Sequence, residues 1–256
     1  MELQPAAAGS GITFYRRDLR IELPAVYALV GETRLGTVLE RDGARVGVIE
    51  HLMAAFSGAG IDDARIELDG PEPPILDGDA LCYLELIDAA GVRLQEGQRG
   101  AIHVRKTVEV RSAEASVRLT PHDGRQFVFT IDFASKLIGH QHFSFAFTEA
   151  GFRSEIAPAR TFGFLSDLDA LLKMGLSRGA SLSNTLAIDG DRLANPQLLR
   201  FADEFVRHKI LDAIGDLALA GAPIYGRFEG HRSSHALNNQ LLRALFADPD
   251  NYVRAD

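Results

Sequence analysis

The chain lacks the features that define several large protein classes. Only one of its 256 residues, Cys82, is a cysteine, so an internal disulfide is excluded and a reducing compartment is favoured. No stretch approaches the roughly 20 apolar residues of a membrane-spanning helix, and the first residues lack the plan of a secretion signal. The net charge of −8 argues against nucleic-acid binding through bulk electrostatics. We therefore expect a cytoplasmic protein without stable membrane insertion and without a nucleic-acid partner.

A helical segment with three regularly spaced polar residues is the most informative part of the chain. Within residues 205–221, His208, Asp212 and Asp216 stand four residues apart, which places them on one stripe of a helix. The other faces are largely apolar, so these groups are expected to be buried and to need partners. One interpretation is a hydrogen-bonded polar stripe. The other is a metal site, since an imidazole and a carboxylate one turn apart can both reach a single zinc ion.

Residues 48–61 repeat this local pattern. A charged residue and a histidine again precede small and apolar residues that end in a glycine-containing turn, and aligning Glu50-His51 with Arg207-His208 indicates a faint internal duplication. Two such helices at a common interface would supply a His, His, Asp ligand set with one position open for water. Glu50 would then be the proton acceptor for that water.

The first half of the chain reads as short strands and two helices. Residues 1–11 show no periodicity and are expected to form a loop. The second helix is expected to be capped by Asp79 and to end near Gly91, with Cys82 as an inert thiol. Polar residues 94–100 mark a domain boundary. Strands are expected at residues 12–15, 21–23, 33–39, 45–49 and 64–68, with a hairpin turn at 41–43.

The second half repeats the plan of the first. Residues 153–164 are expected to be irregular, and helices are expected at residues 166–174, 205–221 and 234–246. Each half then holds several strands and at least two helices, which predicts an α+β architecture repeated in two domains, residues 1–98 and 99–256. Strands are expected at residues 102–110, 116–120, 126–133, 143–147, 186–188 and 224–228.

Several motifs in a fixed order resemble one family. They are EHLMAA at residues 50–55, Asp77-Gly78 after two prolines, ARTFGF at 159–164, EFVRHKILDAIG at 204–215 and HALN at 235–238. Together they resemble UDP-3-O-acyl-N-acetylglucosamine deacetylase, the zinc hydrolase of lipid A and hence lipopolysaccharide biosynthesis in Gram-negative bacteria. The resemblance implies two similar domains, each a small sheet with two helices, whose helices pack face to face with the active site between them.

The resemblance also assigns the metal centre. It implies Zn²⁺ as the cofactor, with His51, His208 and Asp212 as its ligands. Glu50 would be the general base that takes a proton from water, the co-substrate.

Four further residues match the family's catalytic groups. His235 would be the general acid, and Asp216 would favour its protonated form by charge pairing. Thr161 would help to hold the developing oxyanion, and Lys209 would contact the phosphates of the substrate. Amide hydrolysis needs such a base to form hydroxide and such an acid to protonate the leaving amine.

The implied substrate, UDP-3-O-acyl-N-acetylglucosamine, requires an apolar passage and a diphosphate site. Asp132 and Phe133 resemble the pair that receives the uracil ring, although a plain strand end explains them equally well, and Arg232 would supply charge for a phosphate. An insert near residues 162–190, beginning with Phe162 and Phe164, would line the acyl passage. Ordinary core packing also explains most of its apolar residues, namely Leu165, Leu168, Leu172, Met174, Leu176 and Leu182.

Two departures from the family's pattern leave an alternative open. Relatives carry a Gly-Leu-His-Ser-Gly motif ahead of the segment that matches residues 12–14, and its absence is expected to expose a sheet edge and lower stability. Ser234 replaces a usual glycine and is expected to restrict the loop before His235. The alternative is a non-catalytic or altered-substrate relative that keeps the fold. The retained base and acid favour an enzyme, which we expect to be a monomer.

Overall fold

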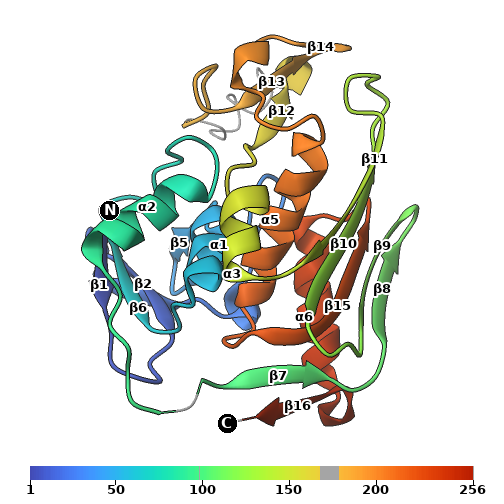
Figure 1. Ribbon diagram of the computed structural model, residues 1–256. Helices are drawn as coiled ribbons and strands as arrows, with labels where there is room; N and C mark the ends of the chain where they lie inside the picture. The colour runs from blue at the N-terminus through green and yellow to red at the C-terminus, as the bar shows by residue number, and fades with distance from the viewer. Residues whose placement is uncertain (98, 168–178, 256) are drawn as a thin grey trace.

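Two β-sheets from different halves of the chain lie on either side of a pair of contacting helices (Figure 1). The computed structural model describes residues 1–97, 99–167 and 179–255. Over these residues the fold is a mixed α+β arrangement, which confirms the predicted class. The two helices, α1 (Glu50–Ala59) and α5 (Glu204–Ala218), carry the metal-ligand candidates of the two halves.

The first half forms a four-stranded sheet of order β1-β6-β2-β3. The alternation predicted for residues 64–68 is confirmed, because Ala64, Ile66 and Leu68 are buried while the intervening Arg65 and Glu67 are only half-buried. The elements are β1 (Glu2–Pro5), β2 (Ile12–Arg16), β3 (Ile21–Pro24), η1 (Tyr27–Leu29), the hairpin β4 (Leu39–Arg41) and β5 (Ala44–Val46), β6 (Ala64–Leu68) and α2 (Leu81–Ala90).

The second half forms a seven-stranded sheet with α5 and α6 beside it (Figure 1). Its main path is β11-β10-β15-β7-β16, and β9 pairs with both β15 and β8. A separate small sheet has the order β12-β13-β14. The strands are β7 (Ala101–Val104), β8 (Val108–Ser112), β9 (Ala115–Thr120), β10 (Arg125–Asp132), β11 (His140–Ala146), β12 (Phe162–Phe164), β13 (Leu186–Asp189), β14 (Arg192–Leu193), β15 (Ile224–His231) and β16 (Tyr252–Ala255). The helical elements are α3 (Glu149–Gly151), the π-helical turn η2 (Phe152–Ile156), η3 (Pro196–Leu198), α6 (His235–Ala247) and η4 (Pro249–Asn251).

A glycine allows α1 and α5 to approach each other closely. A Cβ atom at Gly215 of α5 would lie 2.0 Å from the backbone oxygen of Glu50 at the start of α1. No side chain fits in that space, so glycine is required there despite its cost inside a helix. The contact fixes the two helices at the level of their polar residues.

The sequence predictions fail where pairing between distant segments decides the structure. Residues 1–11 are not all loop, because Glu2–Pro5 pairs antiparallel with β6 and only Leu3 packs on the core. The single strand predicted over residues 102–110 is two strands, since β7 pairs with β15 and β16 whereas β8 pairs with β9. The strand predicted over residues 33–39 is reduced to its last residue, Leu39.

The region predicted to be irregular contains regular pieces. Residues 153–164 include most of the π-helical turn Phe152–Ile156 and all of the short strand Phe162–Phe164. The latter pairs in parallel with β13, so its partner is again distant in the sequence. The helix predicted over residues 166–174 falls mostly outside the described residues.

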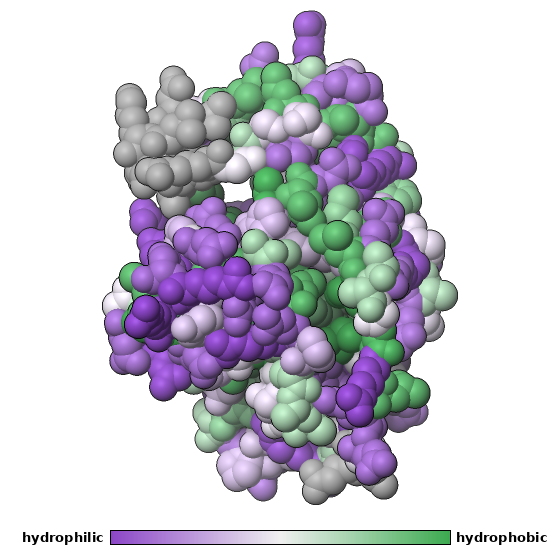
Figure 2. All heavy atoms as spheres, turned by 90° about the vertical axis from the view of Figure 1, so that its left-hand side faces the viewer, coloured by the Kyte–Doolittle hydropathy of each residue, from purple (hydrophilic) through white to green (hydrophobic). Residues whose placement is uncertain are grey.

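The side of the molecule seen in Figure 2 carries a broad hydrophilic area next to a band of hydrophobic residues. The first sheet carries ion pairs, among them Arg17 with Glu67 at 2.6 Å and Arg65 with Glu67 at 2.9 Å. In the part of the chain that the structure describes, no helix combines the length and apolar character needed to cross a bilayer.

Candidate active site

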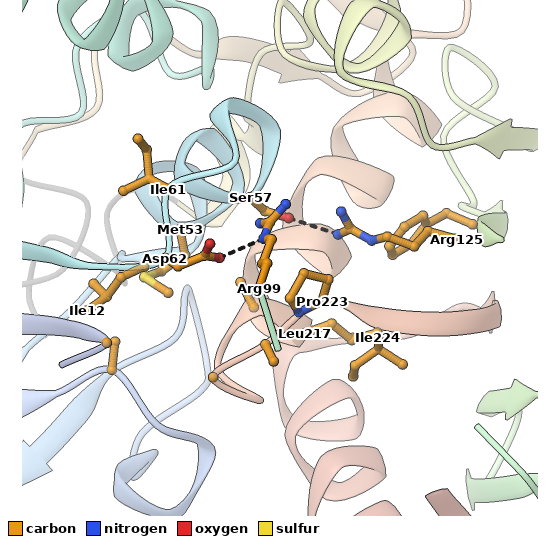
Figure 3. Close-up of a pocket in the computed structure, with 16 residues that line it drawn as sticks. Ile12, Met53, Ser57, Ile61, Asp62, Arg99, Arg125, Leu217, Pro223 and Ile224 are labelled. Atoms are coloured by element: carbon orange, nitrogen blue, oxygen red, sulfur yellow. Dashed lines mark hydrogen bonds and ion pairs between the residues drawn. The ribbon is translucent and has the colours of Figure 1, made fainter. Parts of the chain in front are cut away.

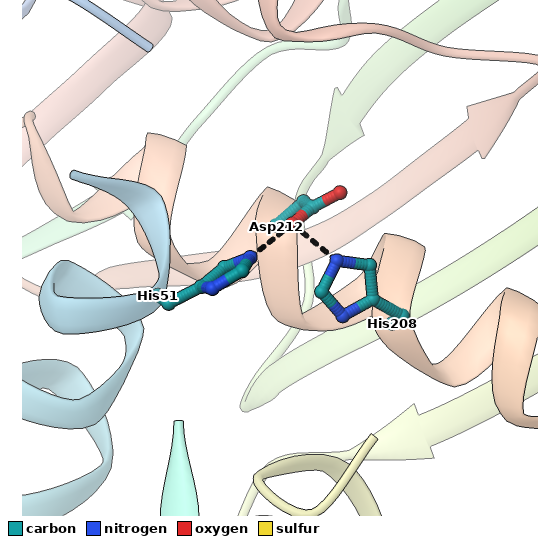
Figure 4. Close-up of side chains that lie close together, drawn as sticks. All are labelled: His51, His208 and Asp212. Carbon is teal, nitrogen blue, oxygen red and sulfur yellow. Dashed lines mark ion pairs between the residues drawn. The ribbon is translucent and has the colours of Figure 1, made fainter. Parts of the chain in front are cut away.

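Three potential metal ligands meet between α1 and α5 (Figure 4). The Oδ1 atom of Asp212 lies 3.3 Å from Nε2 of His208 and 3.6 Å from Nε2 of His51. The ligand atoms of the three residues all lie within 4.8 Å of one another, and all three side chains are buried. The structure therefore brings together the three residues that the sequence predicts as ligands, and a single ion can contact all of them.

The surroundings of His208 prepare it to donate a lone pair. Its Nδ1 donates a hydrogen bond of 3.0 Å to the carbonyl oxygen of Ala159, which leaves Nε2 facing Asp212. Burial lowers the pKa of His208 to about 3, so the imidazole is neutral at physiological pH. A neutral imidazole whose other nitrogen is held by an acceptor is the usual form of a metal-binding histidine.

The charge balance at Asp212 leaves one oxygen without a donor. Although burial opposes it, the positive charges of its neighbours hold the pKa of Asp212 well below its ordinary value. Oδ2 accepts a 2.6 Å hydrogen bond from Nζ of Lys209, but the buried Oδ1 accepts none from the described residues. A buried carboxylate oxygen without a donor is costly, and a cation at this position would satisfy it.

His51 shows the same need for positive charge. Burial lowers the pKa of His51, but the carboxylates of Asp212 and Glu50 outweigh this effect and leave the pKa above its ordinary value. A proton on His51 thus balances the acidic groups, and a metal ion between His51 and Asp212 would take over that role.

Glu50 is held at the edge of this cluster by the backbone. Its Oε2 accepts a 2.9 Å hydrogen bond from the N–H of Thr37. Burial raises the pKa of Glu50 above its ordinary value, which brings it closer to the range in which a carboxylate is an effective general base.

His235 and Asp216, predicted as the general acid and its positioning partner, form a hydrogen-bonded pair. Nδ1 of His235 donates a 2.9 Å hydrogen bond to Oδ2 of Asp216. Burial lowers the pKa of His235, but the charge of Asp216 outweighs it and raises the pKa to about 9. Asp216 is fixed in turn by Thr37 Oγ1 at 2.5 Å and Asn238 Nδ2 at 2.8 Å. The imidazole is therefore protonated near neutral pH, as a general acid must be.

The predicted substrate-binding aromatic residues form one cluster beside His208. The ring centroid of Phe162 lies 6.2 Å from that of His208 and 5.8 Å from that of Phe133, and Phe133 lies 5.9 Å from Phe164. Thr161 directly precedes β12, and its backbone N–H donates a hydrogen bond to the carbonyl of Gly78. The structure thus places an apolar wall next to the ligands, where a substrate chain can pack.

The polar residues predicted to contact substrate all form ion pairs within the protein. Arg232 lies 2.5 Å from Asp132 and also contacts Glu114. Lys209, whose contact with the substrate phosphates stays a prediction, is paired with Asp212. In the insert, Leu165 and Leu182 are exposed, whereas Leu168, Leu172, Met174 and Leu176 lie outside the described residues.

Comparison with known proteins agrees with this geometry. Residues 1–247 match the LpxC family, described as UDP-3-O-acyl N-acetylglycosamine deacetylase. The chain belongs to this family. Relatives named UDP-3-O-acyl-N-acetylglucosamine deacetylase include one from Myxococcus xanthus, 48% identical over 98% of this chain and 81% of the relative, and one from Phenylobacterium zucineum, 48% identical over 97% and 86%. A third, from Campylobacter fetus, is 46% identical over 98% and 85%.

Within this family member, a second group of potential ligands has a different environment. Asp77, Asp79 and Cys82 also bring their ligand atoms within 4.8 Å of one another. Two arginines neutralise the carboxylates: Arg160 and Arg200 lie 2.8 Å and 2.7 Å from Oδ2 of Asp77, and Arg200 also contacts Asp79. The charge that a cation would supply is already present there.

Sequence reasoning missed three groups that position the predicted catalytic and metal-binding side chains. Thr37 binds both Glu50 and Asp216, yet it is 179 residues from Asp216 and carried no local signal. The Ala159 carbonyl orients His208 through the backbone, which residue type does not reveal. Asn238 was detectable, because it follows His235 by three positions and so shares its helix face.

Proposed function

We propose that this chain is a zinc-dependent amidohydrolase that removes the N-acetyl group of UDP-3-O-acyl-N-acetylglucosamine, releasing acetate in the committed step of lipid A biosynthesis. The observation that carries the proposal is the buried Oδ1 of Asp212, which accepts no hydrogen bond from the described residues and lies close to Nε2 of both His51 and His208. Glu50, whose pKa is raised by burial, and the protonated His235 accompany this group. The family and the names of its members support the substrate.

His51, His208 and Asp212 would hold the ion. A bound zinc ion would supply a Lewis acid that polarises the amide carbonyl and lowers the pKa of water. Their N, N, O donor set fits zinc and leaves room for a further ligand. Lys209, bonded to the other oxygen of Asp212, keeps that carboxylate oriented toward the two histidines.

Proton transfer then follows from the residues on either side. Glu50 accepts a proton from the attacking water while Thr37 holds its other oxygen. His235, oriented through Nδ1 by Asp216, donates its Nε2 proton to the leaving amine. The C–N bond breaks, and the products are acetate and the free amine. We place Thr161 at the developing oxyanion and the cluster of Phe133, Phe162 and Phe164 beside the substrate's apolar parts.

The remaining proposals concern organisation. We treat residues 1–98 and 99–256 as two similar domains, which is supported by a sheet and two longer helices in each half. The insert near residues 162–190 is assigned to the acyl passage. A sugar-nucleotide substrate favours action in the cytoplasm, and we propose a monomer, since both histidine ligands come from one chain.

Acetate release from UDP-3-O-acyl-N-acetylglucosamine tests the function. We expect activity to disappear after chelation, to return with zinc, and to fall by at least about 10³-fold in Glu50→Gln. Glutamine keeps the acceptor for the Thr37 N–H, so the fold is preserved. The exposed Glu149→Gln is the matched control and should retain full activity. A folded, zinc-loaded chain that releases no acetate would instead support a non-catalytic or altered-substrate relative.

A further inference from the structure

A cavity lies toward the other ends of the two helices that carry the metal-ligand candidates (Figure 3). Ser57 stands six positions beyond His51 on α1, and Leu217 stands five positions beyond Asp212 on α5, so these two lining residues are roughly 7.5–9 Å further along the helices. Its apolar lining includes Ile12, Met53, Ile61, Phe127, Leu217 and Ile224. Its polar lining includes the guanidinium groups of Arg99 and Arg125 together with Ser57 and Asp62.

Arg125 has no negatively charged partner among the described residues. Its Nη2 donates a 2.8 Å hydrogen bond to Ser57 Oγ, and its guanidinium lies 3.8 Å from the centroid of the Phe147 ring. Its buried Nε donates no hydrogen bond to any residue that the structure describes. Burial, together with the nearby charge of Arg99, lowers the pKa of Arg125 to about 10, so it remains charged at neutral pH. A hydroxyl and an aromatic face only partly compensate a buried cation.

Arg99 differs because it is already neutralised. Its Nε donates a 2.9 Å hydrogen bond to Oδ1 of Asp62. Glu149 also lies on this side, since a Cβ at Gly60 would come within 3.6 Å of Glu149 Oε1 and 3.7 Å of Arg99 Nη1. Arg99 is therefore neutralised by Asp62, and among the described residues that line the cavity the positive charge without an anionic partner is that of Arg125.

We propose that this cavity binds a small organic carboxylate, whose anionic group pairs with Arg125 and whose short apolar body packs against Met53 and Leu217. One uncompensated charge matches a monoanion, whereas a phosphate dianion would be left with excess negative charge among apolar walls. The planar guanidinium suits a carboxylate geometrically. The apolar lining selects an acid with a hydrocarbon part over a bare inorganic ion.

Binding of sodium hexanoate to the zinc-loaded protein tests this proposal. Titration by calorimetry at constant ionic strength should saturate for the unmodified chain. Arg125→Gln should weaken that affinity by at least about tenfold, because it removes the charge that the carboxylate pairs with. Arg227→Gln on the neighbouring strand β15 is the matched control, since Arg227 also has a buried Nε without an acceptor but is paired with Glu229. It should leave the affinity unchanged. Any carboxylate bound at the zinc ion would be the same in both variants, and no turnover is measured, so the result is independent of the proposed deacetylase activity.

A spectroscopic readout covers the case in which Arg125→Gln does not fold. In the ¹⁵N-labelled chain, the Nε–H resonance of Arg125 should shift on addition of hexanoate and follow the same binding curve. An unmoved resonance, an absence of saturation, or equal affinity in Arg125→Gln would overturn the proposal. Inorganic phosphate that binds as tightly as hexanoate would also overturn it, because the cavity would then recognise charge alone.

Discussion

Two groups of side chains in this molecule bring three potential metal ligands within the same distance of one another, yet they differ in charge. In the α1–α5 group, formed by His51, His208 and Asp212, one carboxylate oxygen accepts no hydrogen bond from the part of the chain that the structure describes. In the arginine-paired group, comprising Asp77, Asp79 and Cys82, guanidinium groups already occupy the carboxylates. Proximity of ligand atoms is therefore not sufficient to indicate a metal site. The missing positive charge is what separates the two groups.

The protonation states of His208 and Cys82 also distinguish the two groups. Burial keeps His208 neutral, and the hydrogen bond that its Nδ1 donates to Ala159 leaves the lone pair on Nε2. Burial and the neighbouring Asp79 raise the pKa of Cys82 to about 11, so its sulfur remains a thiol. Thiolate, not thiol, binds metal. The α1–α5 group therefore has a histidine that can bind an ion, whereas the arginine-paired group is an ion-pair network with a protonated thiol.

Removal of one carboxylate charge from each group should give the largest contrast. We expect Asp212→Asn to lose zinc and to lower acetate release by at least about 10³-fold, because the amide cannot replace a buried anionic ligand. Asp77→Asn is the matched substitution and should keep its zinc content. Metal analysis by mass spectrometry after gel filtration measures both. Zinc loss in Asp77→Asn alone would reverse the comparison.

Removal of a cation from the arginine-paired group should affect stability rather than metal. Asp79 is fully buried and contacts Arg200, while its other oxygen accepts the N–H of Cys82 at the start of α2. Arg200→Met leaves that buried carboxylate without its counter-ion, and we expect the free energy of unfolding to fall by about 3 kcal/mol. Urea denaturation measures it. If the variant instead gained a second zinc ion, the arginines would be masking a metal site.

The fold was predictable where local pattern decides it. The alternation in residues 64–68 and the polar stripe of residues 205–221 both correspond to observed elements, β6 and α5. The strand Glu2–Pro5 and the break inside residues 102–110 depend on which distant strand each segment meets, and no local period encodes that. Local chemistry sets an element's type, whereas tertiary pairing sets its bounds.

The candidate site was also predictable only where local spacing decides it. Ligands on one helix, His208 and Asp212, are visible from their spacing, and Glu50 and His51 from the repeated pattern. The approach that unites them depends on Gly215, whose need for open space is invisible until the backbone of Glu50 is placed against it. Ser234, unlike Gly215, does not stand where only glycine fits. Its φ of −139° is one that any residue can adopt, and its Oγ accepts the N–H of Leu237 as a helix cap. The restriction of this loop relative to glycine stays a prediction.

The pH dependence of kcat/KM should sharpen the contrast by testing His235, the predicted general acid beside the α1–α5 group. Because the pKa of His235 is raised to about 9 in the folded chain, its stabilising pairing with Asp216 is complete below about pH 6.5 and lost as pH rises through about 9. We expect kcat/KM to fall above about pH 9. Asp216→Asn should move this fall in kcat/KM to lower pH by one unit or more. If the fall stays at the same pH in Asp216→Asn, the titrating group is not His235.

Cysteine substitution should have the smallest effect and completes the comparison. Cys82 is partly buried on α2, and its high pKa keeps it protonated, so neither metal binding nor nucleophilic chemistry depends on it. We expect Cys82→Ala to keep its zinc content and acetate release, with the free energy of unfolding lowered by less than about 1 kcal/mol, since only a small buried area is lost. Slow modification of the native chain by iodoacetamide, compared with the denatured chain, checks the thiol directly. Rapid modification of the native chain, or loss of zinc in Cys82→Ala, would show that the sulfur is a thiolate. Charge pairing by Arg200 would then no longer explain why the arginine-paired group differs from the α1–α5 group.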